Sequence, residues 1–85
     1  MGIVRSMSPT VFRERGYRFF FFSREEPRKH VHLQSPDGEA KFWLEPGISL
    51  ARAIGISDQE LTRIRRIIEA HEIELRNAWL SHFRR

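Results

Sequence analysis

The first half of the chain consists of short apolar segments separated by polar breaks, which is the pattern of a β-sheet. Arg15-Gly16 divides the first two segments and predicts a tight hairpin. Asp37-Gly38 divides the next two and is a strong turn signal. β-branched and aromatic residues fill the segments between the breaks, as is usual in strands. The strands expected from this pattern are residues 10–14, 17–23, 30–34 and 40–45.

Residues 48–56 fit two patterns. Their larger apolar side chains fall on even positions, which favours a fifth strand. Ala51 and Ala53 would also suit a short helix. The sheet is therefore expected to contain four or five strands.

The end of the chain has the pattern of a helix. Ser57 and Glu60 form a capping box, in which the serine accepts a hydrogen bond from the amide at the third helical position. A helix from residue 58 to about residue 82 would be roughly 35–40 Å long at about 1.5 Å per residue. Its apolar stripe recurs every three to four residues and consists of Leu61, Ile64, Ile68, His71, Leu75, Ala78 and His82.

These elements predict an α+β fold, in which a curved antiparallel sheet is packed on one face by one long C-terminal helix. With 85 residues, the chain is expected to form a single domain with a modest core. The domain divides into a flexible N-terminal extension at 1–7, a β-sheet region at 8–56 and the helix at 57–83. A single helix covers one face of the sheet and leaves the other face open.

Alternation along the strands assigns side chains to the two faces. In the third strand Val31 and Leu33 point one way, and the histidines of the H-V-H motif point the other way. In the fourth strand Phe42 and Leu44 share a face opposite a lysine and a tryptophan. We place the apolar residues under the helix. The open face is then expected to carry His30, His32, Lys41 and Trp43.

Charge and composition limit the kinds of partner. The net charge of +4 and the pI near 10.6 permit binding to nucleic acid or to an acidic protein. The chain contains no cysteine, which excludes disulfides and thiolate metal ligands. No apolar run approaches the roughly 18–20 residues that span a bilayer, and the N-terminus lacks an apolar signal-peptide core. We expect a cytoplasmic protein that has no membrane partner.

Several segments resemble a known family. The segments SPTVFRERGYRFFFFSRE, HVH, DGEAKFWLEP and IGISDQELTRIRRIIEAHEIELRNAW are similar to the small bacterial family called domain of unknown function 4160, over roughly residues 8–79. The resemblance implies one half of a toxin–antitoxin-like gene pair, with a small partner protein encoded by a neighbouring gene. It brings no catalytic residues. The matched motif positions are Gly16, Tyr17, Arg18, His30, His32, Lys41, Phe42, Trp43 and Leu44.

The two histidines raise the hypothesis of a metal-independent ribonuclease. His30 and His32 would lie about 7 Å apart on one strand face and could act as general base and general acid on one phosphate. Nearby cations would stabilise the developing charge, and aromatic rings would stack on bases. The cations are Arg18, Arg28, Lys29 and Lys41, and the aromatic residues are Tyr17 and Trp43.

Two other readings stay open. A metal site would need ligands beyond the two imidazoles, and the available carboxylates have no diagnostic spacing, so we expect neither a metal nor a cofactor. Those carboxylates are Glu25, Glu26, Glu39 and Glu45. The favoured reading is a binding module without catalysis, whose open face docks RNA, the partner protein or a second copy of the chain in a homodimer.

Overall fold

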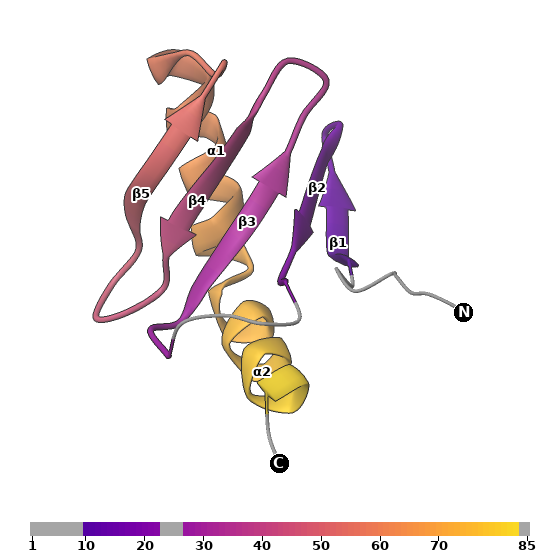
Figure 1. The fold of residues 1–85 in the computed structure, drawn as a ribbon, viewed down its shortest axis with the longest axis vertical. Coiled ribbons are helices and arrows are strands. Elements are labelled where there is room, and N and C mark those ends of the chain that lie inside the picture. Colours follow the sequence, from indigo (N-terminus) through magenta and orange to yellow (C-terminus); the bar gives the residue numbers. More distant parts are fainter. Residues whose placement is uncertain (1–9, 23–26, 84–85) are drawn as a thin grey trace.

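The computed structural model describes residues 10–22 and 27–83. Its five strands form one antiparallel sheet in the order β1-β2-β3-β4-β5, so each strand pairs with its neighbours along the chain (Figure 1). The elements are β1 (Thr10–Glu14), β2 (Tyr17–Phe20), β3 (His30–Gln34), β4 (Glu39–Trp43), β5 (Ser49–Ile54), α1 (Asp58–Ala70) and α2 (Glu72–Phe83). In Figure 1, α1 passes behind the sheet and α2 lies at the bottom of the view, beyond the ends of the strands. The predicted α+β class is confirmed, with five strands. The N-terminal extension expected at 1–7 lies outside the described residues.

The two predicted turns are present. Arg15 and Gly16 have φ angles of 52° and 84°, which is the left-handed pair of a type I′ hairpin between β1 and β2. The β3–β4 turn closes with a 2.9 Å hydrogen bond from the Ser35 amide to the Gly38 carbonyl. At Gly38 a Cβ atom would lie 2.0 Å from the Ile54 carbonyl oxygen. Glycine is therefore needed where this turn approaches the end of β5.

The ambiguous segment is a strand. β5 pairs with β4, and the register shifts between Lys41 and Phe42. Strict alternation does not hold along this segment, because Leu50 and Ile54 are 45% and 55% exposed while Ile48, Ala53 and Ile56 pack against the core. The shift changes the parity within β5, because Leu50 pairs with the core residue Phe42 whereas Arg52 pairs with Lys41 on the opposite face.

The prediction of one long C-terminal helix is wrong, because the structure has two helices that meet at His71. The residues of both helices lie within the predicted helical region. The backbone of His71 has φ −110° and ψ 19°, outside the helical region. Its ring nitrogens bond to Glu14 of β1 at 2.8 Å and to Glu74 of α2 at 2.7 Å. We attribute the break to this pair of tertiary and local contacts. The predicted N-cap is present, since the Ser57 hydroxyl accepts from the Glu60 amide at 3.1 Å.

The core lies between the sheet and the helices. Val31, Leu33, Phe42 and Leu44 are each at most 2% exposed, as the alternation of the strands predicts. Both helices contribute to this core, through Ile64, Ile67 and Ile68 of α1 and through Leu75 and Trp79 of α2. None of the helices in the described part of the chain is long and apolar enough to cross a membrane.

Candidate nucleic-acid interface

The side of the sheet away from the helices carries a row of polar and aromatic side chains across four strands. The register pairs Phe20 with His32, His32 with Lys41, and Lys41 with Arg52. Antiparallel partners of this kind lie side by side on the same face. This row and its neighbours are called the open face below, and its members are Arg18, Phe20, Phe22, His32, Lys41, Trp43 and Arg52.

The aromatic members of the open face contact one another. The Phe20 and His32 rings are stacked with centroids 5.6 Å apart, and Phe22 meets the edge of His32 at 4.4 Å. Phe22 is 43% exposed, which is unusual for so large an apolar ring. Phe22 and the half-buried His32 therefore offer stacking surface to a ligand, whereas Phe20 is 7% exposed and supports them from below.

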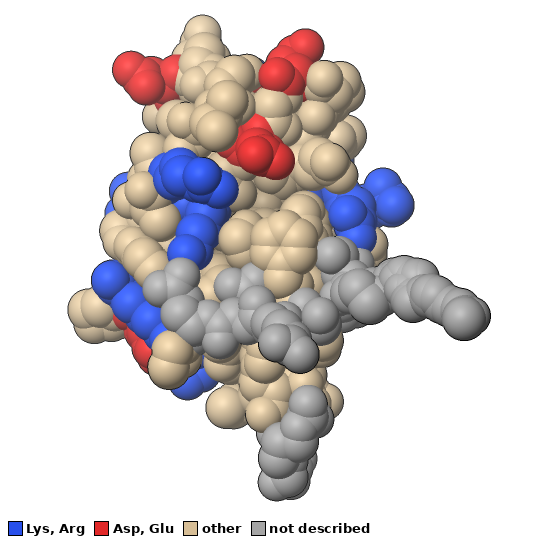
Figure 2. All heavy atoms as spheres, in the orientation of Figure 1, with Lys and Arg blue, Asp and Glu red and all other residues tan. Residues whose placement is uncertain are grey.

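Cations are interleaved with the rings. The Arg18 guanidinium lies 4.3 Å from the centroid of Phe20, and Arg28 and Lys41 lie 4.0 and 4.4 Å from the centroid of Trp43. Such contacts hold the long basic side chains along the sheet surface and keep their charge at the surface. Figure 2 shows this side of the molecule, with basic side chains on both sides of a central area and most of the visible acidic side chains toward the top of the view.

A small cavity of about 60 Å³ lies on the open face between β2 and β5. It has room for about two water molecules. Its lining combines the exposed ring of Phe22 and the rings of Phe20 and His32 with one cation and one carboxylate. The lining residues include Phe20, Phe22, His32, Glu39, Arg52 and Ile54.

The expectation that both histidines line an accessible surface is wrong for His30. Its pairing with Trp43 is as alternation predicts, but the side chain is 0% exposed. The ring centroid of His30 lies 5.0 Å from Trp79 of α2, so this helix reaches the start of β3 and encloses the ring. Nδ1 lies 2.7 Å from the Arg28 carbonyl oxygen. His32 is half-buried and remains on the open face.

Tyr17 was also expected on the binding surface, and the structure places it elsewhere. It is 7% exposed and belongs to the core under the helices. Its hydroxyl donates to a Glu60 carboxylate oxygen at 2.7 Å. The pKa of Tyr17 is raised, mainly by burial and to a smaller extent by this hydrogen bond. Tyr17 has the same parity as Phe19 and Phe21, which are buried. Parity along β2 therefore assigns the open face to Phe20 and Phe22, which sequence reasoning did not single out.

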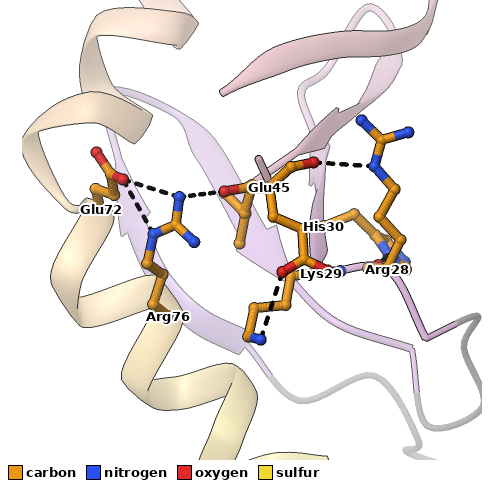
Figure 3. A network of polar contacts seen from close by, with 7 residues as sticks. Arg28, Lys29, His30, Glu45, Glu72 and Arg76 are labelled. Atoms are coloured by element: carbon orange, nitrogen blue, oxygen red, sulfur yellow. Dashed lines mark hydrogen bonds and ion pairs between the residues drawn. The ribbon is translucent and has the colours of Figure 1, made fainter. Parts of the chain in front are cut away.

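Lys29 is part of a structural network at the start of β3. Its ammonium lies 3.5 Å from Glu45, and its backbone amide donates to the same carboxylate at 3.1 Å (Figure 3). This amide is the main reason why the pKa of Glu45 is lowered. From α2, Arg76 donates to the Leu44 carbonyl and, at 3.0 Å, to Glu72. The network thus ties the ends of β3 and β4 to α2.

Arg28 belongs to the same network and also reaches the open face. Its Nε donates to the Glu45 carbonyl at 2.9 Å, while its guanidinium lies over Trp43. No group of three or more His, Asp or Glu side chains suited to a metal ion occurs in residues 10–22 and 27–83. Glu25 and Glu26, considered above as ligands, lie outside those residues.

Comparison with known proteins identifies the family. A family model described as "Domain of unknown function (DUF4160)" matches residues 16–80, most of the chain. The chain belongs to this family. No curated protein and no solved structure matches it. The DUF4160 match includes every residue of the open face, so that surface is part of the family domain.

Proposed function

We propose that this DUF4160 protein binds single-stranded RNA through the open face. The observation that supports it best is the alternation of cations and rings over four strands, with Arg18 over Phe20 and Lys41 over Trp43. Proteins that bind single strands combine a basic surface for the phosphates with aromatic platforms for the bases. The open face has both components.

The roles of the residues follow from their surroundings. Two cations already lie over Trp43, whereas Phe22 is 43% exposed. We therefore assign base stacking to Phe22 and His32, and phosphate contacts to Lys41 and Arg52. Binding of this kind releases counterions, so affinity should fall as salt rises, with a slope of about 0.7 per neutralised phosphate.

Binding without cleavage fits this surface better than the ribonuclease alternative. A general acid–base pair needs both groups within hydrogen-bond reach of the substrate. His30 is enclosed and its Nδ1 is bonded to the Arg28 carbonyl, so a nuclease using His30 and His32 would first have to expose His30.

The test is the affinity of the purified chain for a labelled single-stranded RNA of about twelve nucleotides, followed by fluorescence anisotropy. We expect the variant Lys41→Ala/Arg52→Ala to bind about tenfold or more weakly and to reduce the salt slope by about 1.4. The matched control is Arg65→Ala on α1, which removes a cation already bonded to Glu69. The control should bind as wild type does. Equal affinity of wild type and the double variant would refute the proposal.

The same RNA is also analysed for cleavage, in the presence of EDTA. Intact RNA with wild type agrees with binding alone. Cleavage that is lost in His32→Ala would instead support the ribonuclease alternative, with His30 exposed in the active state.

A second candidate function is docking of a small partner protein, as proposed for toxin–antitoxin-like pairs. The observation that favours it is on α2, where Ile73 and Leu80 are 77% and 55% exposed. They lie seven residues apart and so share one side of the helix. A partner from the neighbouring gene should co-elute with wild type in size-exclusion chromatography, and not with Ile73→Glu/Leu80→Glu. Co-elution with both would place the contact elsewhere.

A further inference from the structure

A second group of cations lies on the helix side of the sheet, at the β1–β2 turn. Arg15 comes from the left-handed position of that turn, and Arg63 and Arg66 come from α1. The three arginines surround a hollow of about 370 Å³, called the arginine hollow below. Its complete lining is Glu14, Arg15, Arg63, Arg66, Ile67 and Ala70.

Within the described part of the chain, no carboxylate pairs with any of the three arginines. Across residues 10–22 and 27–83, Arg15, Arg63 and Arg66 form no ion pair, although Arg63 lies beside the Tyr17 hydroxyl and opposes the rise in its pKa. The carboxylates on this side of the molecule are engaged by other groups. These pairs are Glu14 with His71 at 2.8 Å, Glu60 with Tyr17 at 2.7 Å, and Glu69 with Arg65 at 3.3 Å.

The one carboxylate on the rim of the arginine hollow is Glu14, and its charge is offset. The hydrogen bonds of His71 to Glu74 and Glu14 raise the pKa of His71, which favours the protonated ring. The floor is apolar, since Ile67 is 6% exposed and is followed one helical turn later by Ala70. Three exposed arginines thus line one hollow whose floor includes the buried side chain of Ile67.

We propose that the arginine hollow is a phosphate-binding site, separate from the open face and independent of the function proposed for it. Guanidinium groups match the geometry of phosphate oxygens and form paired, charge-assisted hydrogen bonds with them. The group bound is a phosphate, carried either by a small phosphorylated molecule or by the backbone of a nucleic acid.

The experiment titrates the isotope-labelled chain with inorganic pyrophosphate and follows the arginine Nε–H signals by nuclear magnetic resonance. We expect saturable shifts at Arg15, Arg63 and Arg66. Arg66→Gln should weaken binding about tenfold, the value of one charge-assisted contact. Its matched control is the adjacent Arg65→Gln, which removes a cation bonded to Glu69 and to the Ile48 carbonyl. The control should change the affinity less than about twofold.

Two results would overturn the site. One is a set of equal, non-saturating shifts at all exposed arginines, Arg13 and Arg52 included, which indicates general attraction of the anion. The other is equal weakening by Arg66→Gln and Arg65→Gln. Circular dichroism of both variants ensures that a loss of binding is not a loss of folding.

The source of the phosphate is decided by competition. Single-stranded RNA is added to the pyrophosphate complex of the variant Lys41→Ala/Arg52→Ala, whose open face is weakened. Displacement from the arginine hollow identifies the nucleic-acid backbone as the ligand. Retention of pyrophosphate identifies a small phosphorylated molecule. Because pyrophosphate alone reports on this site, failure of RNA binding at the open face leaves its test intact.

Discussion

The ring of His71, at the junction of α1 and α2, contacts both β1 and α2. Its Nε2 lies 2.8 Å from Glu14 of β1, its Nδ1 lies 2.7 Å from Glu74 of α2, and its face stacks on Phe12 at 4.1 Å. With carboxylates at both nitrogens, the ring is held best when both nitrogens carry protons. The joint between α1 and α2 is therefore stabilised by a charge that depends on pH.

This charge predicts the direction of the pH dependence of stability. The bonds to Glu74 and then to Glu14 raise the pKa of His71 above the ordinary value of about 6.5. A group with a raised pKa in the folded state contributes stability that is full below its unfolded pKa and is lost as pH rises through the folded pKa. The free energy of unfolding of wild type should therefore fall, relative to His71→Gln, as pH rises above about 6.5.

Urea unfolding of both proteins between about pH 5.5 and about pH 8.5 measures this difference. The other three histidines are common to both proteins, so the difference between the two curves isolates His71. If the free energies of unfolding of wild type and His71→Gln changed in parallel with pH, Glu14 and Glu74 would not stabilise a protonated His71 ring.

The two histidines of the H-V-H motif should differ sharply in their effect on stability. His30 is fully buried and bonded to a carbonyl, so His30→Ala leaves a cavity and an unsatisfied oxygen. We expect a loss of about 2–4 kcal/mol in the free energy of unfolding. His32 is half-buried at the surface, and His32→Ala should cost about 1 kcal/mol or less. Equal losses in chemical denaturation would contradict the packing described for β3.

At the scale of elements, the β3–β4 turn fits against the end of β5 through two glycines. A Cβ on Gly38 would lie 2.0 Å from the Ile54 carbonyl, and one on Gly55 would lie 2.5 Å from the Asp37 carbonyl. Backbone atoms cannot move aside as a flexible side chain can. This close approach fixes the turn against the edge strand.

Gly38→Ala should therefore lower the free energy of unfolding by about 2–3 kcal/mol, as overpacking does elsewhere. Gly47 is the matched control, because a Cβ there would meet nothing within 4 Å and its φ angle is not in the left-handed region. Gly47→Ala should change stability by less than about 0.5 kcal/mol. Thermal unfolding of the two variants gives the comparison, and similar melting temperatures would show that the turn can shift away from β5.

Strand periodicity and turn chemistry were sufficient to predict the first four strands, because alternation and positive-φ dipeptides are local properties of the sequence, whereas the register shift in β5 left residues 48–56 ambiguous. The break at His71 was not predictable in this way. His71 continues the apolar stripe of the helix, and the contact that accompanies the break comes from Glu14, 57 residues earlier. Periodicity carries no information on such a distant partner.

The candidate site was predicted in part for the same reason. Alternation placed His32, Lys41 and Trp43 on the side away from the helices, and the structure has them there. Alternation along a strand does not show which end of the strand a helix covers. The enclosure of His30 by Trp79 of α2 was therefore not predicted. Tyr17 was grouped with the site for its chemistry, although its parity matched that of the core.

At the scale of the whole molecule, positive charge is divided between two sides. The open face lies on one side of the sheet, and the arginine hollow lies where α1 meets the β1–β2 turn on the other. The core occupies the layer between them. Variants at one surface therefore leave the other intact, which is why the two proposals can be tested separately.

The strand order also bears on synthesis of the chain. Every strand pairs with its sequence neighbour, so each hairpin closes a short loop and can form soon after its second strand leaves the ribosome. The contacts that cover the sheet are the distant ones, such as Tyr17 with Glu60 across 43 positions. During translation the sheet therefore precedes its helices, and its apolar side stays uncovered until α1 and α2 have been synthesised. The order of elements thus makes the helices the part of this chain that covers the nascent apolar surface.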